Sequence, residues 1–310
     1  MNLIFFICGI VILLVSGDLL VRAAIAMSIK MKLSPMIIGL TVVAFGTSAP
    51  ELLVGVEATW NGYTGLALGN IIGSNITNVL LILGVPALII AIKNDDRELI
   101  KNYYFMLVAT AVFISFLVLD EIKFWHGISL ILFLILFIVQ AIFYNIESKT
   151  NMTFEKTDPE RKNLNIGMLL AFSAIGFLGL PVGAKILIIS ATNFAETFGV
   201  SEEVIGLTVV AVGTSLPELA TSIVAAYRRE VNLLLGNVIG SNMFNILGIA
   251  GTAALIAPLQ LTDQIEFLSL TALILSSIVL APIIIWNKSI SRLIGIIFLL
   301  IYACYNVVLF

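Results

Sequence analysis

The sequence is poor in charged residues and in the side chains that hold transition metals. Only 11% of its 310 residues are charged, and it contains two cysteines and one histidine. Cys8 and Cys304 lie near opposite ends of the chain without a CxxC pattern, and His126 stands alone, so no zinc site is expected. No histidine, thiol or carboxylate pair is arranged around a nucleophile, so we expect no enzyme activity. We likewise expect no cofactor and no nucleic-acid partner.

Apolar residues dominate instead. They make up 60% of the chain, and the mean hydropathy of +1.12 is far above that of a soluble domain, so we expect an integral protein of the lipid bilayer. Ten apolar segments are long enough, at about 20 residues, to cross about 30 Å of hydrocarbon as a helix. The first lacks the basic start of a secretory signal peptide, so we expect it to stay in the mature protein. We predict an all-α polytopic membrane protein with ten transmembrane helices, at 2–24, 33–59, 66–90, 101–119, 125–145, 164–190, 203–227, 232–257, 265–286 and 290–309.

Lysine and arginine are distributed unevenly between the predicted loops. Ten spans place both termini on one side of the membrane, and 14 of the 16 basic residues fall on the opposite side. Because cytoplasmic loops carry the excess of Lys and Arg, both termini are predicted to lie outside. The outer side carries eight acidic and two basic residues. These belong either to ordinary solvated loops or to a vestibule that concentrates cations.

A polar segment, residues 147–163, divides the chain into two halves. It holds eight charged residues and one proline, and it is too short to fold as a domain. We predict a first half of five spans at 1–146, a cytoplasmic linker at 147–163, and a second half of five spans at 164–310.

The two halves share repeated motifs. "IGLTVVAFGTSAPEL" (38–52) and "IGLTVVAVGTSLPEL" (205–219) agree at 13 of 15 positions, and "GNIIGSNITNVLLILG" (69–84) and "GNVIGSNMFNILGIAG" (236–251) agree at 10 of 16. Both pairs are separated by 167 residues. Because each half has an odd number of spans, the second half should cross the bilayer inverted relative to the first. Inverted repeats place a substrate site near the midplane, where the halves meet.

The polar residues of the first motif pair fall on one helix face. Their spacing of i, i+3, i+4 and i+7 aligns them along about 10 Å of helix axis. Pro50 has no N–H to donate to the Gly46 carbonyl, so the helix should kink and free backbone oxygens at 44–47. The glycine before each Thr-Ser pair should make this opening easier. The aligned residues are Ala44, Thr47, Ser48 and Glu51, followed in the second copy by Ala211, Thr214, Ser215 and Glu218.

The second motif pair contributes neutral polar side chains at i, i+4 and i+8. Amide and hydroxyl oxygens suit Na+ or orient a carboxylate. Glycines repeated beside them let helices approach closely, so these residues either line a site or hold helices together. They are Asn70, Ser74 and Asn78 in the first half and Asn237, Ser241 and Asn245 in the second.

Glu51 and Glu218 are the residues least suited to hydrocarbon. A charge at the bilayer centre costs about 2.5 to 3.5 kcal/mol even on the gentler insertion scale. Two facing carboxylates also repel, so the pair requires a divalent cation, two or more monovalent cations, or a proton. Carboxylates, hydroxyls and freed carbonyls are ligands for a hard cation such as Ca2+. Switching such a site from one side of the membrane to the other would be unfavourable when it is empty and favourable when it holds either set of cations. A protein with this site would therefore exchange one set of cations for the other.

The four motifs in this order resemble the paired α-repeats of the Ca2+/cation antiporter superfamily, and the ten spans resemble its prokaryotic Na+/Ca2+ exchanger branch. The resemblance covers essentially the whole chain. It implies the sodium/calcium exchanger fold in a prokaryotic inner membrane, and electrogenic Na+-driven Ca2+ extrusion by alternating access. The first and sixth spans would slide as a gating pair, and we expect a monomer.

The resemblance also implies roles for individual residues. Glu51 and Glu218 would bind Ca2+, assisted by the backbone oxygens of Thr47 and Thr214. The Na+ sites would use the carbonyls of Ala44 and Ala211 with Ser48, Ser215, Ser74 and Ser241, while Asn78 and Asn245 would line the centre.

Asn245 departs from the pattern of many relatives, including K+-dependent ones, which carry Asp at this position. Its neutral side chain argues against K+ cotransport. No glutamate lies in the "GN" helices, where the proton-coupled branch has one, which favours Na+ over H+. Exchange coupled to H+, or Na+/H+ exchange, is an alternative. A passive cation channel is another, because an inverted repeat with an acidic vestibule would also suit a pore.

Two charged residues within the spans are not assigned to the site. Asp18 and Lys185 occupy equivalent positions under the offset of 167. We expect Asp18 to lie at the membrane interface and Lys185 to extend its charged end toward water.

Overall fold

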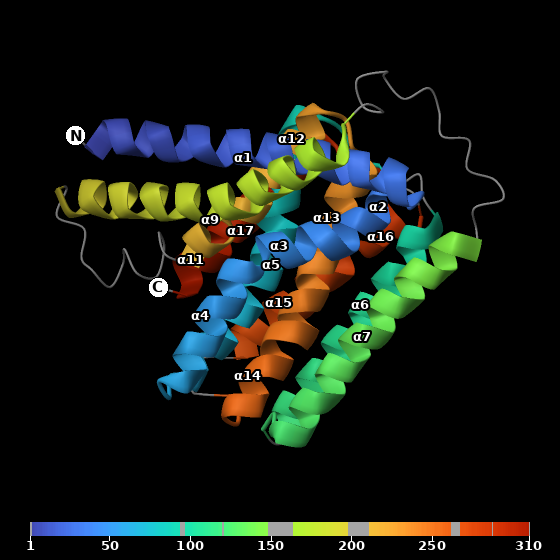
Figure 1. The fold of residues 1–310 in the computed structure, drawn as a ribbon. Coiled ribbons are helices and arrows are strands. Elements are labelled where there is room, and N and C mark those ends of the chain that lie inside the picture. Colours follow the sequence, from blue (N-terminus) through green and yellow to red (C-terminus); the bar gives the residue numbers. More distant parts are fainter. Residues whose placement is uncertain are drawn as a thin grey trace.

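The computed structural model describes residues 2–93, 97–119, 121–147, 164–197, 211–261, 267–286 and 288–309. These residues are helical apart from short connections and two isolated β-bridges, so the all-α prediction is confirmed (Figure 1). Two predicted segments fall mainly outside the described residues. They are the linker after Glu147 and the start of the seventh span, at 203–210.

Six helices in the described part are long and apolar enough to cross a membrane, and a seventh span is possible if one bent pair counts as a single span. The six are α1 (Asn2–Met31), α5 (Thr64–Ile89), α6 (Arg97–Leu119), α7 (Phe124–Glu147), α9 (Ile166–Thr197) and the run of α13 (Val231–Met243), η4 (Phe244–Ile249) and α14 (Ala250–Ile256). The predicted ninth and tenth spans contain shorter apolar helices: α15 (Phe267–Val279), α16 (Ala281–Ile284) and α17 (Arg292–Leu309).

The second predicted span is a broken helix. It runs through α2 (Pro35–Ile38), the π-helix η1 (Gly39–Val43) and α3 (Ala44–Thr47), then resumes as α4 (Ala49–Trp60) after a bend of 46°. The break lies at Ser48, where φ is −83° and ψ is 5°.

The second copy of the motif breaks at the equivalent residue. Helix α11 (Ala211–Thr214) ends and α12 (Leu216–Tyr227) begins on either side of Ser215, where φ is −87° and ψ is 5°. Pro50 and Pro217 each lie in the first turn of the new helix, where a missing N–H leaves no internal hydrogen bond unmade. The sequence predicts a kink at these prolines, and the structure shows instead that the helix stops and restarts just before them.

Helices α1 and α9 pack side by side along the top of the view in Figure 1. Their contacts come in pairs. A Cβ built on Gly9 would lie 3.0 Å from the Cβ of Leu187, and one built on Gly176 would lie 2.8 Å from the Cβ of Leu20. Adding 167 to 9 and to 20 gives 176 and 187, so each contact is the counterpart of the other.

The first broken helix touches α13 backbone to backbone. A Cβ on Gly236 would lie 2.3 Å from the carbonyl oxygen of Met36, and one on Gly240 would lie 2.4 Å from that of Leu40. Both distances are too short for any side chain, so glycine is required for this approach. The contact brings the "GTSAPE" copy of the first half beside the "GNVIGSN" copy of the second.

Candidate cation site

The two repeated glutamates lie together at the helix breaks. Glu51 and Glu218 are in the first turns of α4 and α12, and each side chain is 1% exposed. The Ser48 hydroxyl donates to Glu218 Oε1 at 3.1 Å, and the Ser215 hydroxyl donates to Glu51 Oε1 at 3.5 Å. Each serine therefore binds the glutamate of the other half, and neither half alone holds the pair.

Helix direction favours negative charge at these positions. Both α4 and α12 have 12 residues and begin directly after the break. The N-terminus of a helix carries unpaired N–H groups and a partial positive charge, which stabilises a nearby carboxylate. This compensation is partial, because the effect is equivalent to about half an elementary charge for each helix.

Asparagines of α5 and α13 both bond to residues beside the first break, at Ser48. The side-chain amide of Asn70 donates to the backbone carbonyl of Glu51 at 3.3 Å. The Thr47 hydroxyl lies 3.4 Å from Asn237 Oδ1, to which it donates. Asn70 and Asn237 are equivalent in the repeat. Asn70 contacts the first motif copy from the same half of the chain, whereas Asn237 contacts it from the second half.

Asn242 takes part in the polar network, although it is not among the site residues predicted from the sequence. It accepts a hydrogen bond from the Asn78 amide at 3.0 Å, and its own amide donates to the Met106 sulfur at 3.6 Å. Asn242 and its counterpart Asn75 lie one residue off the i, i+4, i+8 face considered above. Their identity in both copies of "GSN" was the available signal.

Several buried polar atoms around this centre have no hydrogen-bond partner. Buried polar groups are nearly always paired, so a group of unpaired oxygens calls for an explanation. A cation coordinated by these oxygens would supply one. The unpaired oxygens are Glu51 Oε2, Glu218 Oε2, Ser241 Oγ and Asn245 Oδ1, and the Asn237 amide nitrogen is also unpaired.

The described residues contain no group of three or more His, Cys, Asp or Glu side chains that could hold a metal. A cation here would rely on two carboxylates and on neutral oxygens. That set suits hard, oxygen-preferring cations rather than transition metals.

Most of the other predicted site residues that the structure describes are buried. Ala44, Thr47 and Ser74 are buried, and Thr214 is half-buried with a partner. Ala211 opens α11, and its side chain lies outside the described part. The Ala44 carbonyl accepts the Ser48 N–H at 2.9 Å, so the predicted release of carbonyls at 44–47 does not include this one. The Gly46 carbonyl cannot accept a hydrogen bond from residue 50, because Pro50 has no N–H.

Helix α9 covers the glycine of both motif copies. A Cβ on Gly46 would lie 1.9 Å from Cε1 of Phe177, and one on Gly213 would lie 2.3 Å from Cδ1 of Ile188. The sequence suggested that these glycines ease the opening of the helix. The structure adds a second reason, because side chains of α9 rest directly on them.

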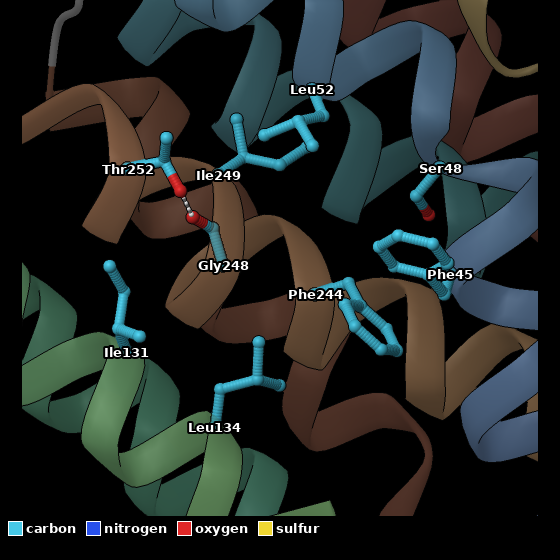
Figure 2. A pocket seen from close by; sticks show the side chains of 9 residues that line it. All are labelled: Phe45, Ser48, Leu52, Ile131, Leu134, Phe244, Gly248, Ile249 and Thr252. Atoms are coloured by element: carbon cyan, nitrogen blue, oxygen red, sulfur yellow. Dashed lines mark hydrogen bonds between the residues drawn. The ribbon is translucent and has the colours of Figure 1, made fainter.

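A cavity of about 170 Å³ lies beside Ser48, between α3, α4, α7 and η4 (Figure 2). Neither glutamate lines it, and apart from two hydroxyls its walls are apolar. The Thr252 hydroxyl is already bonded to the Gly248 carbonyl, so the cavity offers a cation few ligands. Its lining residues are Phe45, Ser48, Leu52, Ile131, Leu134, Phe244, Gly248, Ile249 and Thr252.

Comparison with known proteins identifies the fold and the family. Residues 1–143 and 168–310 match the family described as sodium/calcium exchanger protein. The chain belongs to this family. Its fold matches that of the exchanger NCX_Mj, soaked with 10 mM Na+ and 10 mM Sr2+, with a TM-score of 0.83 and 31% identity over 98% of this chain and 96% of the other. The structure of NCX_Mj soaked without Na+ and Ca2+ matches with a TM-score of 0.85.

Full-length relatives of this exchanger-family protein occur in archaea and bacteria. Sodium/calcium exchanger MaX1 of Methanosarcina acetivorans is 31% identical over 100% of this chain and 98% of its own length. Inner membrane protein YrbG of Escherichia coli is 33% identical over 91% of this chain and 88% of its own. The exchanger-family protein is therefore an integral membrane transporter rather than an enzyme, with cations as its substrates and no cofactor required.

Proposed function

We propose that this protein exchanges Na+ for Ca2+ across the membrane by alternating access. The observation that carries the proposal is the pair of buried glutamates, each hydrogen-bonded to a serine of the opposite half. Each uncompensated charge costs about 2.5 to 3.5 kcal/mol at the bilayer centre, so moving the empty site across the membrane is costly. Loading with one Ca2+ or with several Na+ removes that cost. Exchange is then favoured over uncoupled transport.

Within this proposal Ca2+ binds between Glu51 and Glu218, with backbone oxygens of Thr47 and Thr214. Support comes from the one unpaired carboxylate oxygen that each glutamate retains. Na+ binds on either side of this centre, and the unpaired oxygens of Ser241 and Asn245 support that part. The proposed Na+ and cavity residues are Ala44, Ser48, Ser74, Asn78, Ala211, Ser215, Ser241 and Asn245.

We further propose ten transmembrane helices in two inverted repeats, 1–146 and 164–310, joined by the linker 147–163. Contacts related by the offset of 167 support this. The pair Ser48 and Glu218 has its counterpart in Ser215 and Glu51, and the contact of Gly9 with Leu187 has its counterpart in Leu20 and Gly176. Exchanging partners in this way is what a twofold axis between the halves produces.

The remaining parts of the proposal concern coupling and topology. More than two Na+ for each Ca2+ makes transport electrogenic, and the neutral Asn245 makes it independent of K+. The excess of basic residues in one set of loops puts the linker in the cytoplasm and both termini outside. The protein acts as a monomer in a prokaryotic inner membrane, and its relative YrbG is described as an inner membrane protein.

Reconstituted vesicles test the proposal. Vesicles loaded with Na+ and diluted into Na+-free buffer should take up Ca2+. Because more than two Na+ leave for each Ca2+ that enters, net positive charge moves outward, so a positive interior should increase uptake and a negative interior should decrease it. A simpler readout of charge movement is the current on a supported membrane, whose sign should follow the Na+ flux. Glu51→Gln and Glu218→Gln should each abolish uptake. Glu57→Gln, an exposed glutamate of α4, is the matched control and should retain it.

Other outcomes identify the alternatives. Uptake that follows a pH gradient and ignores Na+ would establish proton coupling. Conductance without a counter-ion would establish a channel. Undiminished uptake in both glutamine variants would remove the basis of the proposal.

A further inference from the structure

Asp18 joins α1 to the end of α12. Its Oδ1 accepts from Arg228 Nε at 2.6 Å and also lies against Arg228 Nη2, while its Oδ2 accepts from Arg22 Nε at 2.8 Å. The Asp18 and Arg228 side chains are 29% and 25% exposed, so this ion pair is partly shielded from water. Contact through two guanidinium nitrogens makes it more directional than an ordinary surface pair.

Gly17, next to Asp18, lies where α1 packs closely against α12. A Cβ on Gly17 would lie 3.4 Å from the backbone of Ala220, which is ordinary van der Waals contact, and Ala220 is 5% exposed. The counterpart of Ala220 in the first half is Leu53 of α4, since 220 less 167 is 53. Leu53 is 68% exposed. The pair of helices α1 and α9 therefore covers α12 but leaves the equivalent surface of α4 open.

The ion pair has no counterpart in the other half. The offset of 167 relates Asp18 to Lys185 and Arg228 to Asn61. Lys185 is exposed, and the Asn61 amide donates to the Glu57 carbonyl within its own helix. A lysine and an asparagine cannot form an ion pair. If α9 closed on α4 in the opposite state, this contact would be missing.

We propose that Asp18, held by Arg22 and Arg228, is a latch that keeps α1 closed on the cytoplasmic end of α12 and so favours the outward-open state. The proposal rests on the alternating-access exchange and the membrane orientation proposed above. Because only one of the two closed states has the ion pair, the two states of the exchanger differ in free energy even though the repeats are similar. Asp18, Arg22 and Arg228 are positioning residues and do not contact the transported cations.

Sided kinetics test the latch. Arg228→Gln should lower the KM for cytoplasmic Ca2+ and raise the KM for extracellular Ca2+, changing their ratio about fivefold, the factor that corresponds to about 1 kcal/mol. Maximal rates should change less.

Arg229→Gln is the matched control. It removes the same charge one residue away, where the side chain is exposed, and should leave the ratio of the two KM values unchanged. The charge reversal Asp18→Arg with Arg228→Asp should restore the ratio in part. KM values that move together, or an equal effect of Arg229→Gln, would overturn the latch.

A second measurement needs no ion flux. In a background of Cys8→Ser and Cys304→Ser, the pair Gly17→Cys and Ala220→Cys should form a disulfide under mild oxidation. Adding Arg228→Gln should reduce the cross-linked fraction at early times, and adding Arg229→Gln should not. An unchanged fraction would contradict the latch whether or not the protein exchanges Na+ for Ca2+. Absence of Na+-driven Ca2+ uptake in the unmodified protein would contradict the proposed function alone.

Discussion

Replacing Gly46 with alanine tests how α9 packs over the first motif. The new Cβ would lie 1.9 Å from Cε1 and 2.2 Å from Cδ1 of Phe177. Carbon atoms in contact are about 3.5 to 4.0 Å apart, so the ring has to move by about 1.5 to 2 Å. Phe177 is partly buried and packed against the core, which limits that movement. Overpacking of this kind costs about 1 to 3 kcal/mol.

Gly213 provides the matched comparison within the same motif. Its Cβ would meet Cδ1 of Ile188 at 2.3 Å and Cγ1 at 2.5 Å, whereas the Cβ of Ile188 is 3.9 Å away. The end of an isoleucine side chain can rotate aside more easily than a ring can move. Gly213→Ala should therefore cost less than Gly46→Ala, although the two motifs are nearly identical. Gly167→Ala in α9, with its nearest neighbour at 3.4 Å, is the control for the substitution itself.

Thermal unfolding of the purified protein in detergent measures these effects, with Ca2+ uptake in vesicles as the second readout. Gly46→Ala should lower the melting temperature most, Gly213→Ala less and Gly167→Ala least. Combining Gly46→Ala with Phe177→Ala should cost less than the sum of the two single changes, because the second removes the ring that the first displaces. Equal stability of the two motif variants, or additive costs in the double variant, would refute the packing described here.

Three further predictions follow from other parts of the molecule. Arg229 and Gly62 occupy equivalent positions with φ of 61° and 83°, a conformation that costs a residue with a side chain about 1 to 2 kcal/mol. Arg229→Gly should raise the melting temperature and Gly62→Ala should lower it; the opposite order would contradict this assignment. Ca2+ transport should proceed at full rate when K+ is replaced by choline, and a strict K+ requirement would contradict the interpretation of Asn245. A tag at either terminus should react with impermeant reagents added outside intact cells, and reaction only after permeabilisation would reverse the proposed topology.

The sequence was sufficient to predict the helical class, the membrane location and the pair of glutamates. Those features depend on local composition and on repetition, both of which can be read along the chain. Glu51 and Glu218 are conspicuous because carboxylates are rare in apolar segments, and their shared context reveals the repeat. The structure brings them to one place, with each bonded to the serine of the other half.

Other features depend on the tertiary arrangement and could not be read in this way. The hydrogen bond of Asn78 to Asn242 joins residues 164 positions apart, and the ion pair of Asp18 with Arg228 joins residues 210 positions apart. Periodicity within one helix does not specify such partners. The prolines illustrate a local limit, because Pro50 is compatible either with a kink or with the first turn of a new helix. The structure shows the second.

Equilibrium binding of Ca2+ to the purified protein tests the central claim most directly. Isothermal titration without Na+ should show Ca2+ binding that added Na+ displaces and that K+ does not. Glu51→Gln and Glu218→Gln should each weaken binding strongly, while Glu57→Gln should bind as the unmodified protein does. Ca2+ binding that survives in both Glu51→Gln and Glu218→Gln, or that Na+ fails to displace, would contradict a shared cation site between the two glutamates.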